Sequence, residues 1–129
     1  MRVRVYVVSE ATGRVEVELT DERSPRTFRA LLEALPIESR AMRWGDELYF
    51  EVPVDVPEEN AVDVVEKGAV AYWPPGRCLC IFWGPTPASK EPGEIRPASP
   101  VNIVGRVVGD PTVFNRVRPG DLVRVERAP

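Results

Sequence analysis

Apolar and polar residues alternate along most of the chain, in short runs that end near glycine or proline. In residues 2–8, Val3, Val5 and Val7 share one face of an extended strand, and charged residues separate them. A turn at residues 11–13 leads to a second run at 14–19, so we predict an opening hairpin that is buried on one face. Further strands are predicted at residues 37–43, 47–52, 69–73, 78–83, 102–108 and 122–126.

One segment departs from this alternation and shows the spacing of a helix. Ser24 suits the N-cap, Pro25 suits the first helical position, and Pro36 ends the segment. The apolar residues between them form a single stripe, which consists of Phe28, Leu31, Leu32 and Leu35. We therefore predict a helix over residues 25–35. A single helical turn is predicted at 111–117, and residues 61–65 fit either a short strand or a helical turn.

Two apolar strands are predicted side by side at the centre of the sequence. Residues 69–73 and 78–83 flank a turn at Pro74-Pro75-Gly76. The second strand is apolar on both faces, so we expect it to be covered on both sides. Residues 84–100 then carry five prolines and form a long loop, and loops of this length are often functional. A tight hairpin turn is also predicted at Gly45-Asp46.

The count of about eight short strands indicates a barrel or a sandwich. A closed barrel removes the exposed edges that apolar strands would otherwise present to solvent. We therefore predict a mainly β fold, a closed eight-stranded β-barrel with one or two short capping helices. The 129 residues show no internal repeat and no domain boundary, so a single domain over residues 1–129 is expected.

Charge and composition restrict the partners of the chain. The formal net charge is −3 and the isoelectric point about 5.1, which argues against a general nucleic-acid binder. No apolar run reaches the ~20 residues that a membrane helix needs, and the N-terminus is expected to form a strand and not a signal peptide. We expect a cytoplasmic protein without nucleic-acid or membrane partners. Its 14 prolines and its lack of glutamine resemble the bias of heat-adapted proteins and predict a thermophilic source.

The reactive side chains restrict the chemistry further. Histidine is absent, so no His-based triad or acid–base pair is available. We interpret Cys78 and Cys80 as buried core residues that form no disulfide, with a metal site as the alternative. Asp46 and Glu47 face opposite sides of a strand, which argues against a paired-carboxylate site. No phosphate loop or dinucleotide fingerprint occurs, so we expect no cofactor. Because there is no histidine and no further cysteine, we also expect no metal.

Several patches resemble the cyclophilins in their order along the chain. They are residues 25–31, 68–72, 81–82, 103–108 and 113–117. More specific runs are similar to the small cyclophilin-like proteins of bacteria and archaea, whose function is not known; these runs are residues 44–50, 72–76 and 97–99. The chain is identified as a member of that family, and the resemblance implies a closed eight-stranded cyclophilin-like β-barrel capped by helices.

The resemblance is incomplete at the catalytic motif of the isomerase cyclophilins. Their Phe-His-Arg and Gln-Gly-Gly-Asp segments have no full counterpart in residues 38–44, where only Arg40 could stand for the catalytic arginine. Ser99 lies where the resemblance places a pocket tryptophan and histidine. Arg40 could weaken a prolyl amide bond as a hydrogen-bond donor, and its alternative interpretation is a solvated strand residue.

Aromatic residues are dense between positions 44 and 83, and most are interpreted as barrel core. Trp73 and Trp83 end strands beside the long loop, where aromatic edges next to polar groups are typical of a ligand cleft. Arg77 follows the proline turn and is either a cleft residue or a charge at a loop tip. The predicted ligand-binding residues are Tyr49, Trp73, Arg77, Phe82, Trp83 and Ser99.

Three functions are compatible with these features. The favoured hypothesis is a binding module that holds a small molecule or short peptide in an aromatic cleft. The alternative is a weak peptidyl-prolyl cis-trans isomerase that uses Arg40, although most of the catalytic motif is missing. The third is an assembly protein whose apolar surface mediates self-association, for example as a homodimer.

Overall fold

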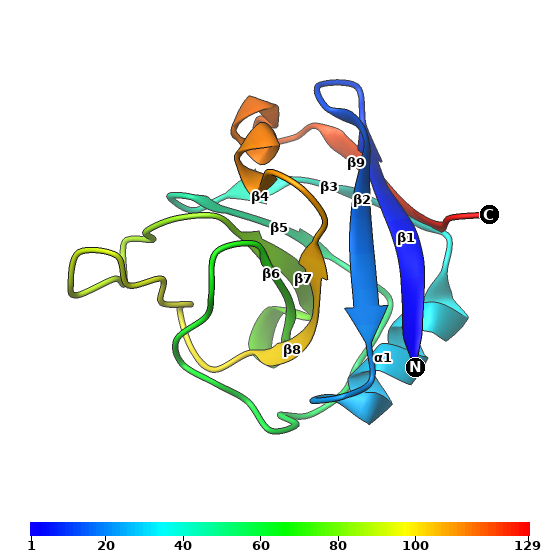
Figure 1. The fold of residues 1–129 in the computed structure, drawn as a ribbon, viewed down its shortest axis with the longest axis horizontal. Coiled ribbons are helices and arrows are strands. Elements are labelled where there is room, and N and C mark those ends of the chain that lie inside the picture. Colours follow the sequence, from blue (N-terminus) through cyan, green and yellow to red (C-terminus); the bar gives the residue numbers. More distant parts are fainter.

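The computed structural model describes residues 1–129 and shows one antiparallel sheet of nine strand segments wrapped into a barrel (Figure 1). The strands are β1 (Arg2–Ser9), β2 (Gly13–Thr20), β3 (Ile37–Arg40), β4 (Met42–Arg43), β5 (Glu47–Glu51), β6 (Ala69–Trp73), β7 (Cys78–Phe82), β8 (Asn102–Val107) and β9 (Leu122–Arg127). One α-helix, α1 (Pro25–Ala34), and two 3₁₀ helices, η1 (Pro74–Gly76) and η2 (Pro111–Arg116), complete the fold. Within the sheet the strands follow the order β3-β9-β1-β2-β8-β6-β7-β5-β4.

The barrel closes because one continuous segment supplies both edges of the sheet. The predicted strand at residues 37–43 divides at Ala41 into β3, which pairs with β9, and β4, which pairs with β5. At the division, the Ala41 N–H donates to the Asp121 carbonyl at 2.8 Å, and the Ala41 carbonyl accepts from the Gly120 N–H at 2.7 Å. The eight predicted strands therefore appear as nine segments, and the predicted mainly β barrel is confirmed.

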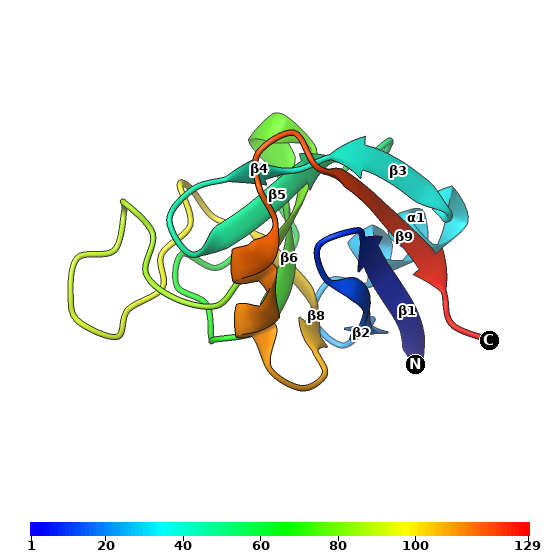
Figure 2. The same cartoon turned by 90° about the horizontal axis from the view of Figure 1, so that it is seen from above.

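The barrel interior holds a cluster of 24 buried apolar residues. The period-2 alternation turns Val5 and Val7 of β1 inward, as predicted. Helix α1 adds Phe28 and Leu31, and η2 adds Phe114 from the opposite end of the barrel (Figures 1 and 2). Helices α1 and η2 therefore close the two ends of the barrel. None of the helices is long and apolar enough to cross a membrane.

Helix α1 is capped by a residue that lies far from it in the sequence. Ser24 occupies the N-cap as predicted, but its side chain caps no N–H group and donates instead to the Glu59 carbonyl at 3.3 Å. The Glu59 carboxylate accepts from the N–H groups of Arg26 and Thr27, each at 2.9 Å, and from the Thr27 hydroxyl at 2.8 Å. Burial by itself raises the pKa of the Glu59 carboxyl, but these hydrogen bonds outweigh it and hold the pKa below its ordinary value.

Glu59→Ala is expected to lower the free energy of unfolding at neutral pH by about 0.5–2 kcal/mol, the usual cost of losing a helix cap. Because the folded-state pKa is depressed, the charge-dependent part of this contribution is present above the unfolded pKa and is lost as the pH falls through the folded one. Urea denaturation at about pH 7 and pH 3 measures both effects. Glu58→Ala removes a neighbouring exposed carboxylate as the control, and equal losses in the two variants would contradict the capping role.

The outer faces of β6 and β7 carry a second apolar layer, which confirms that the strand predicted at residues 78–83 is covered on both sides. Eight buried residues form it: Val65, Ala69, Ala71, Cys78, Cys80, Phe82, Ile95 and Val101. Ile95 and Val101 come from the segment between β7 and β8, which contains no strand or helix. Residues 61–65 form neither the strand nor the helical turn considered above, because they contribute a single bridge, Val62 to Val101. Residues 61–65 and the 84–100 loop therefore lie over one side of the barrel (Figure 2).

Candidate ligand-binding cleft

An open cleft of about 270 Å³ lies between the outer face of the barrel and the end of the 84–100 loop. Three of its seven lining residues are aromatic, and one carboxylate lies among them. The lining residues are Trp44, Glu47, Tyr49, Trp73, Pro97, Ala98 and Val101. They come from the β4–β5 turn, from β5, from the end of β6 and from the loop that leads into β8.

Strand alternation explains why these side chains meet. In β5 the side chains of Leu48 and Phe50 enter the barrel core, so Glu47 and Tyr49 face outward. The β5–β7 register places Glu47 opposite Phe82 and Tyr49 opposite Cys80. Tyr49 packs against the second apolar layer, and Val101 of that layer is part of the cleft lining.

A tight turn brings Trp44 to the same place. The Trp44 N–H donates to the Glu47 carbonyl at 3.0 Å, which confirms the predicted hairpin turn at Gly45-Asp46. Gly45 has a φ of +63°, and a Cβ there would lie 2.8 Å from the Pro85 carbonyl oxygen. Glycine is therefore required, because the turn needs a left-handed backbone and the 84–100 loop approaches it closely.

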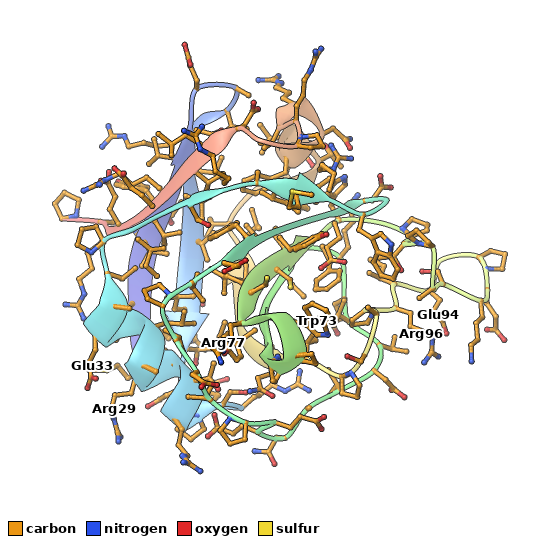
Figure 3. All side chains as sticks on the ribbon, turned by 180° about the vertical axis from the view of Figure 1, so that it is seen from behind. Arg29, Glu33, Trp73, Arg77, Glu94 and Arg96 are labelled. Atoms are coloured by element: carbon orange, nitrogen blue, oxygen red, sulfur yellow. The ribbon has the colours of Figure 1, made fainter.

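Trp73 forms a fixed wall of the cleft. Its indole N–H donates to the Ser99 hydroxyl at 2.7 Å, and this bond connects the end of β6 to the loop. The ring also lies against Gly76 of η1, where any Cβ would collide with it. In Figure 3, Trp73 lies on the side of η1 that faces Glu94 and Arg96 of the loop, and Arg77 lies on the other side.

The loop is held in place by its own polar contacts. The Ser89 hydroxyl accepts from the N–H groups of Thr86 and Arg96, at 3.0 and 3.3 Å. Arg96 forms ion pairs with Glu94 at 2.9 Å and with Asp63 at 3.7 Å, and Figure 3 shows Glu94 and Arg96 next to each other on the loop. These contacts hold the loop in one conformation beside the cleft.

Glu47 is the electrostatic centre of the cleft. The residue is only 6% exposed, and it takes part in none of the ion pairs of the protein. Burial raises the pKa of its carboxyl from 4.5 to about 7, and hydrogen bonding with the Cys80 thiol offsets this only in part. The carboxyl therefore changes its charge near neutral pH.

The other titratable groups around Glu47 stay neutral in that range. Burial, the largest cause in each case, raises the pKa of the Cys78 thiol to about 11 and that of Cys80 well above its ordinary value. Burial, together with the neighbouring cysteines and Glu47, also raises the pKa of the Tyr49 hydroxyl. Both cysteines are free and buried in the second apolar layer. Near pH 7, Glu47 is therefore the group that sets the charge of the cleft.

The structure brings together three of the six predicted ligand-binding residues. Tyr49 and Trp73 line the cleft, and Ser99 lies behind Trp73 as its hydrogen-bond partner. Phe82 is fully buried in the second apolar layer and does not line the cleft. Arg77 is exposed at the proline turn, where it has a φ of +52° and forms an ion pair with Asp55 at 3.7 Å.

Trp83 and Arg40 lie elsewhere in the fold. Trp83 does not present the exposed edge expected at a strand end, because its ring packs against Phe114 and its indole N–H donates to Asn115 at 2.9 Å. The Arg43 guanidinium covers the same ring at 5.0 Å from its centre. Arg40 is exposed on β3, and its guanidinium donates to the Gly120 carbonyl at 3.2 Å.

Sequence reasoning missed Glu47 as a cleft residue. The alternation that assigns Tyr49 to the outer face of β5 also assigns Glu47 to it, two residues earlier. An acidic residue two positions before an outward aromatic residue was thus the available signal. The sequence does not show that the turn at Trp44 and the loop residues Pro97, Ala98 and Val101 meet, because only the tertiary fold brings the turn and the loop together.

Comparison with known proteins places the chain in a family. A family model described as cyclophilin-like matches residues 1–126. A hypothetical protein from Archaeoglobus fulgidus, known from its solution structure, is 48% identical, with a TM-score of 0.82; the match covers 98% of this chain and 95% of that one. A search of curated proteins gives no significant match. The sequence match and the shared barrel together show that the chain belongs to the cyclophilin-like family.

Proposed function

We propose that this cyclophilin-like protein is a binding module that holds a small molecule or a short peptide in the cleft lined by Trp44, Tyr49 and Trp73. The observation that carries the proposal is the cleft itself, in which three aromatic side chains lie around one buried carboxyl group. Ligand sites are typically concave and apolar, with a few fixed polar groups that orient the ligand. This cleft has both properties.

The size of the cleft sets the scale of the ligand. Its volume of about 270 Å³ is close to the lower limit of about 300 Å³ for pockets that hold drug-sized molecules. One small metabolite or one side chain of a peptide would fill it. Because one side is open, the rest of a peptide could continue along the surface of the loop.

No observation favours the isomerase alternative. Arg40 is not among the residues that line the cleft, and its guanidinium contacts the Gly120 carbonyl on the β3–β9 side of the barrel. A donor that weakens a prolyl amide would have to lie beside the ring-binding pocket. We therefore propose binding and not catalysis.

Ala98→Phe is expected to abolish binding, because Ala98 is an exposed lining residue and a phenyl ring there would fill the cleft from its rim. Thermal-shift screening of metabolite and peptide libraries identifies ligands, since a ligand that binds the folded state raises the melting temperature. Ala88→Phe, in the same loop but outside the lining, is the matched control and should bind as the parent does. The proposal fails if no ligand is found, or if Ala98→Phe binds as tightly as the control.

A further inference from the structure

Glu47 is a buried carboxyl group without a positive partner. It is more than nine-tenths buried and faces the cleft, and no arginine or lysine lines that cleft. Buried charges in proteins are normally paired, because an isolated charge loses its hydration without compensation. The residues of the cleft therefore supply no positive charge to balance Glu47, and a bound ligand would have to supply it.

The side chains around Glu47 suit a particular kind of cation. Trp44, Tyr49 and Trp73 present aromatic rings, whose negative faces attract cations and favour those with alkyl groups. A hard divalent metal would need about six oxygen ligands, whereas the cleft offers one carboxylate. No group of three or more acidic or cysteine side chains in the protein could hold a metal.

We propose that the cleft binds an alkylammonium group, with Glu47 as its counter-charge and Trp44, Tyr49 and Trp73 as the aromatic walls. This inference rests on the proposed binding function and names the class of ligand. The same chemistry occurs in a free methylated amine and in a methylated lysine side chain of a peptide. Both sources would place the same charged head group in the cleft.

Binding should depend on pH in a defined direction. The carboxylate form of Glu47 attracts the cation and the protonated form does not, so affinity rises as the pH increases through about 7. The groups that face Glu47 are Tyr49 of β5 and Cys78 and Cys80 of β7, and all three stay neutral in this range. A quaternary ammonium ion does not titrate, so the pH dependence of its binding reports on Glu47.

The test compares choline with 3,3-dimethylbutan-1-ol, which has the same shape but no charge. Isothermal titration at about pH 8 should show choline binding about tenfold or more tightly than the neutral compound, and this preference should weaken at about pH 5.5. Short peptides that contain trimethyllysine, lysine or the uncharged norleucine form a second arm. Tighter binding of choline than of trimethyllysine peptide identifies a free amine as the ligand, and the reverse order identifies a peptide.

Two variants separate the charge from the shape of the site. Glu47→Gln should remove the preference for choline, whereas Glu51→Gln, an equal loss of charge on the same face of β5 but outside the cleft, should retain it. Equal binding of charged and neutral compounds, or an unchanged preference in Glu47→Gln, overturns the inference. The inference is also overturned if no cation binds while the library screen finds neutral ligands whose binding Ala98→Phe abolishes. In that case the proposed binding function survives.

Discussion

Glu47→Gln is expected to stabilise the ligand-free protein by about 3 kcal/mol at about pH 8, although most buried substitutions destabilise. The pKa of the Glu47 carboxyl is about 7 in the folded state and 4.5 when the group is fully solvated. Each unit of that difference corresponds to about 1.4 kcal/mol. Glutamine has nearly the same shape and carries no charge, so the variant avoids the cost of desolvating a carboxylate.

The pH dependence gives the sign of this effect. Between pH 4.5 and about 7 the folded protein binds the Glu47 proton more tightly than the unfolded chain does. The stability of the parent therefore falls as the pH rises through this interval, and the difference from Glu47→Gln disappears below it. Urea denaturation of the parent, Glu47→Gln and Glu51→Gln across this range measures the effect. A parent profile that coincides with Glu47→Gln at every pH would show that Glu47 has an ordinary pKa.

Phe114→Ala is expected to lower the free energy of unfolding by about 3–5 kcal/mol, the usual cost of removing a large aromatic side chain from a core. Phe114 is fully buried and packs against Trp83, with 6.2 Å between the ring centres. It comes from η2, which closes one end of the barrel. Its removal leaves a cavity that the fixed strands around it cannot fill.

Val113→Ala is the neighbouring control for the Phe114→Ala substitution. Val113 belongs to the same 3₁₀ helix but is only partly buried against the core, so its truncation should cost much less. Guanidinium denaturation followed by circular dichroism gives both values. Similar losses at Phe114 and Val113 would indicate that η2 is loosely packed and does not seal the barrel.

The strands and the helix were predictable because they depend on local pattern. The runs at residues 69–73 and 122–126 and the helix after Ser24 agree with β6, β9 and α1 to within one residue. The division at Ala41 was not predictable, because it reflects pairing with two distant strands, β9 and β5. The role of Glu59 as the cap of α1 was hidden for the same reason, since it lies more than 30 residues from Thr27.

The candidate site was only partly predictable. Tyr49 and Trp73 could be assigned to a cleft because strand alternation and the nearby loop placed them at the surface. Trp83 has the same position at a strand end, but Asn115 and Phe114 cover it from a segment about 30 residues further along the chain. Arg40 illustrates the limit of family resemblance, because a matching residue type does not ensure a position in the cleft.

Glu47 connects stability to the proposed function. A buried carboxylate without a partner costs stability, and proteins keep such groups mainly at functional sites. A cation in the cleft would offset this cost, so the stabilisation that a bound cation gives should be larger above about pH 7 than below it. The stabilising effect of Glu47→Gln and its loss of cation preference therefore have one physical cause.

The indole N–H signals of the three tryptophans in a nitrogen-15 NMR spectrum test the location of the site most directly. Trp44 and Trp73 line the cleft. Trp83 is only 4% exposed, lies in the barrel core and donates a hydrogen bond to Asn115. During a choline titration at about pH 8, the Trp44 and Trp73 signals should shift with a common dissociation constant while the Trp83 signal stays in place. A shift of the Trp83 signal alone, or no indole shift at saturating choline, would contradict cation binding in this cleft.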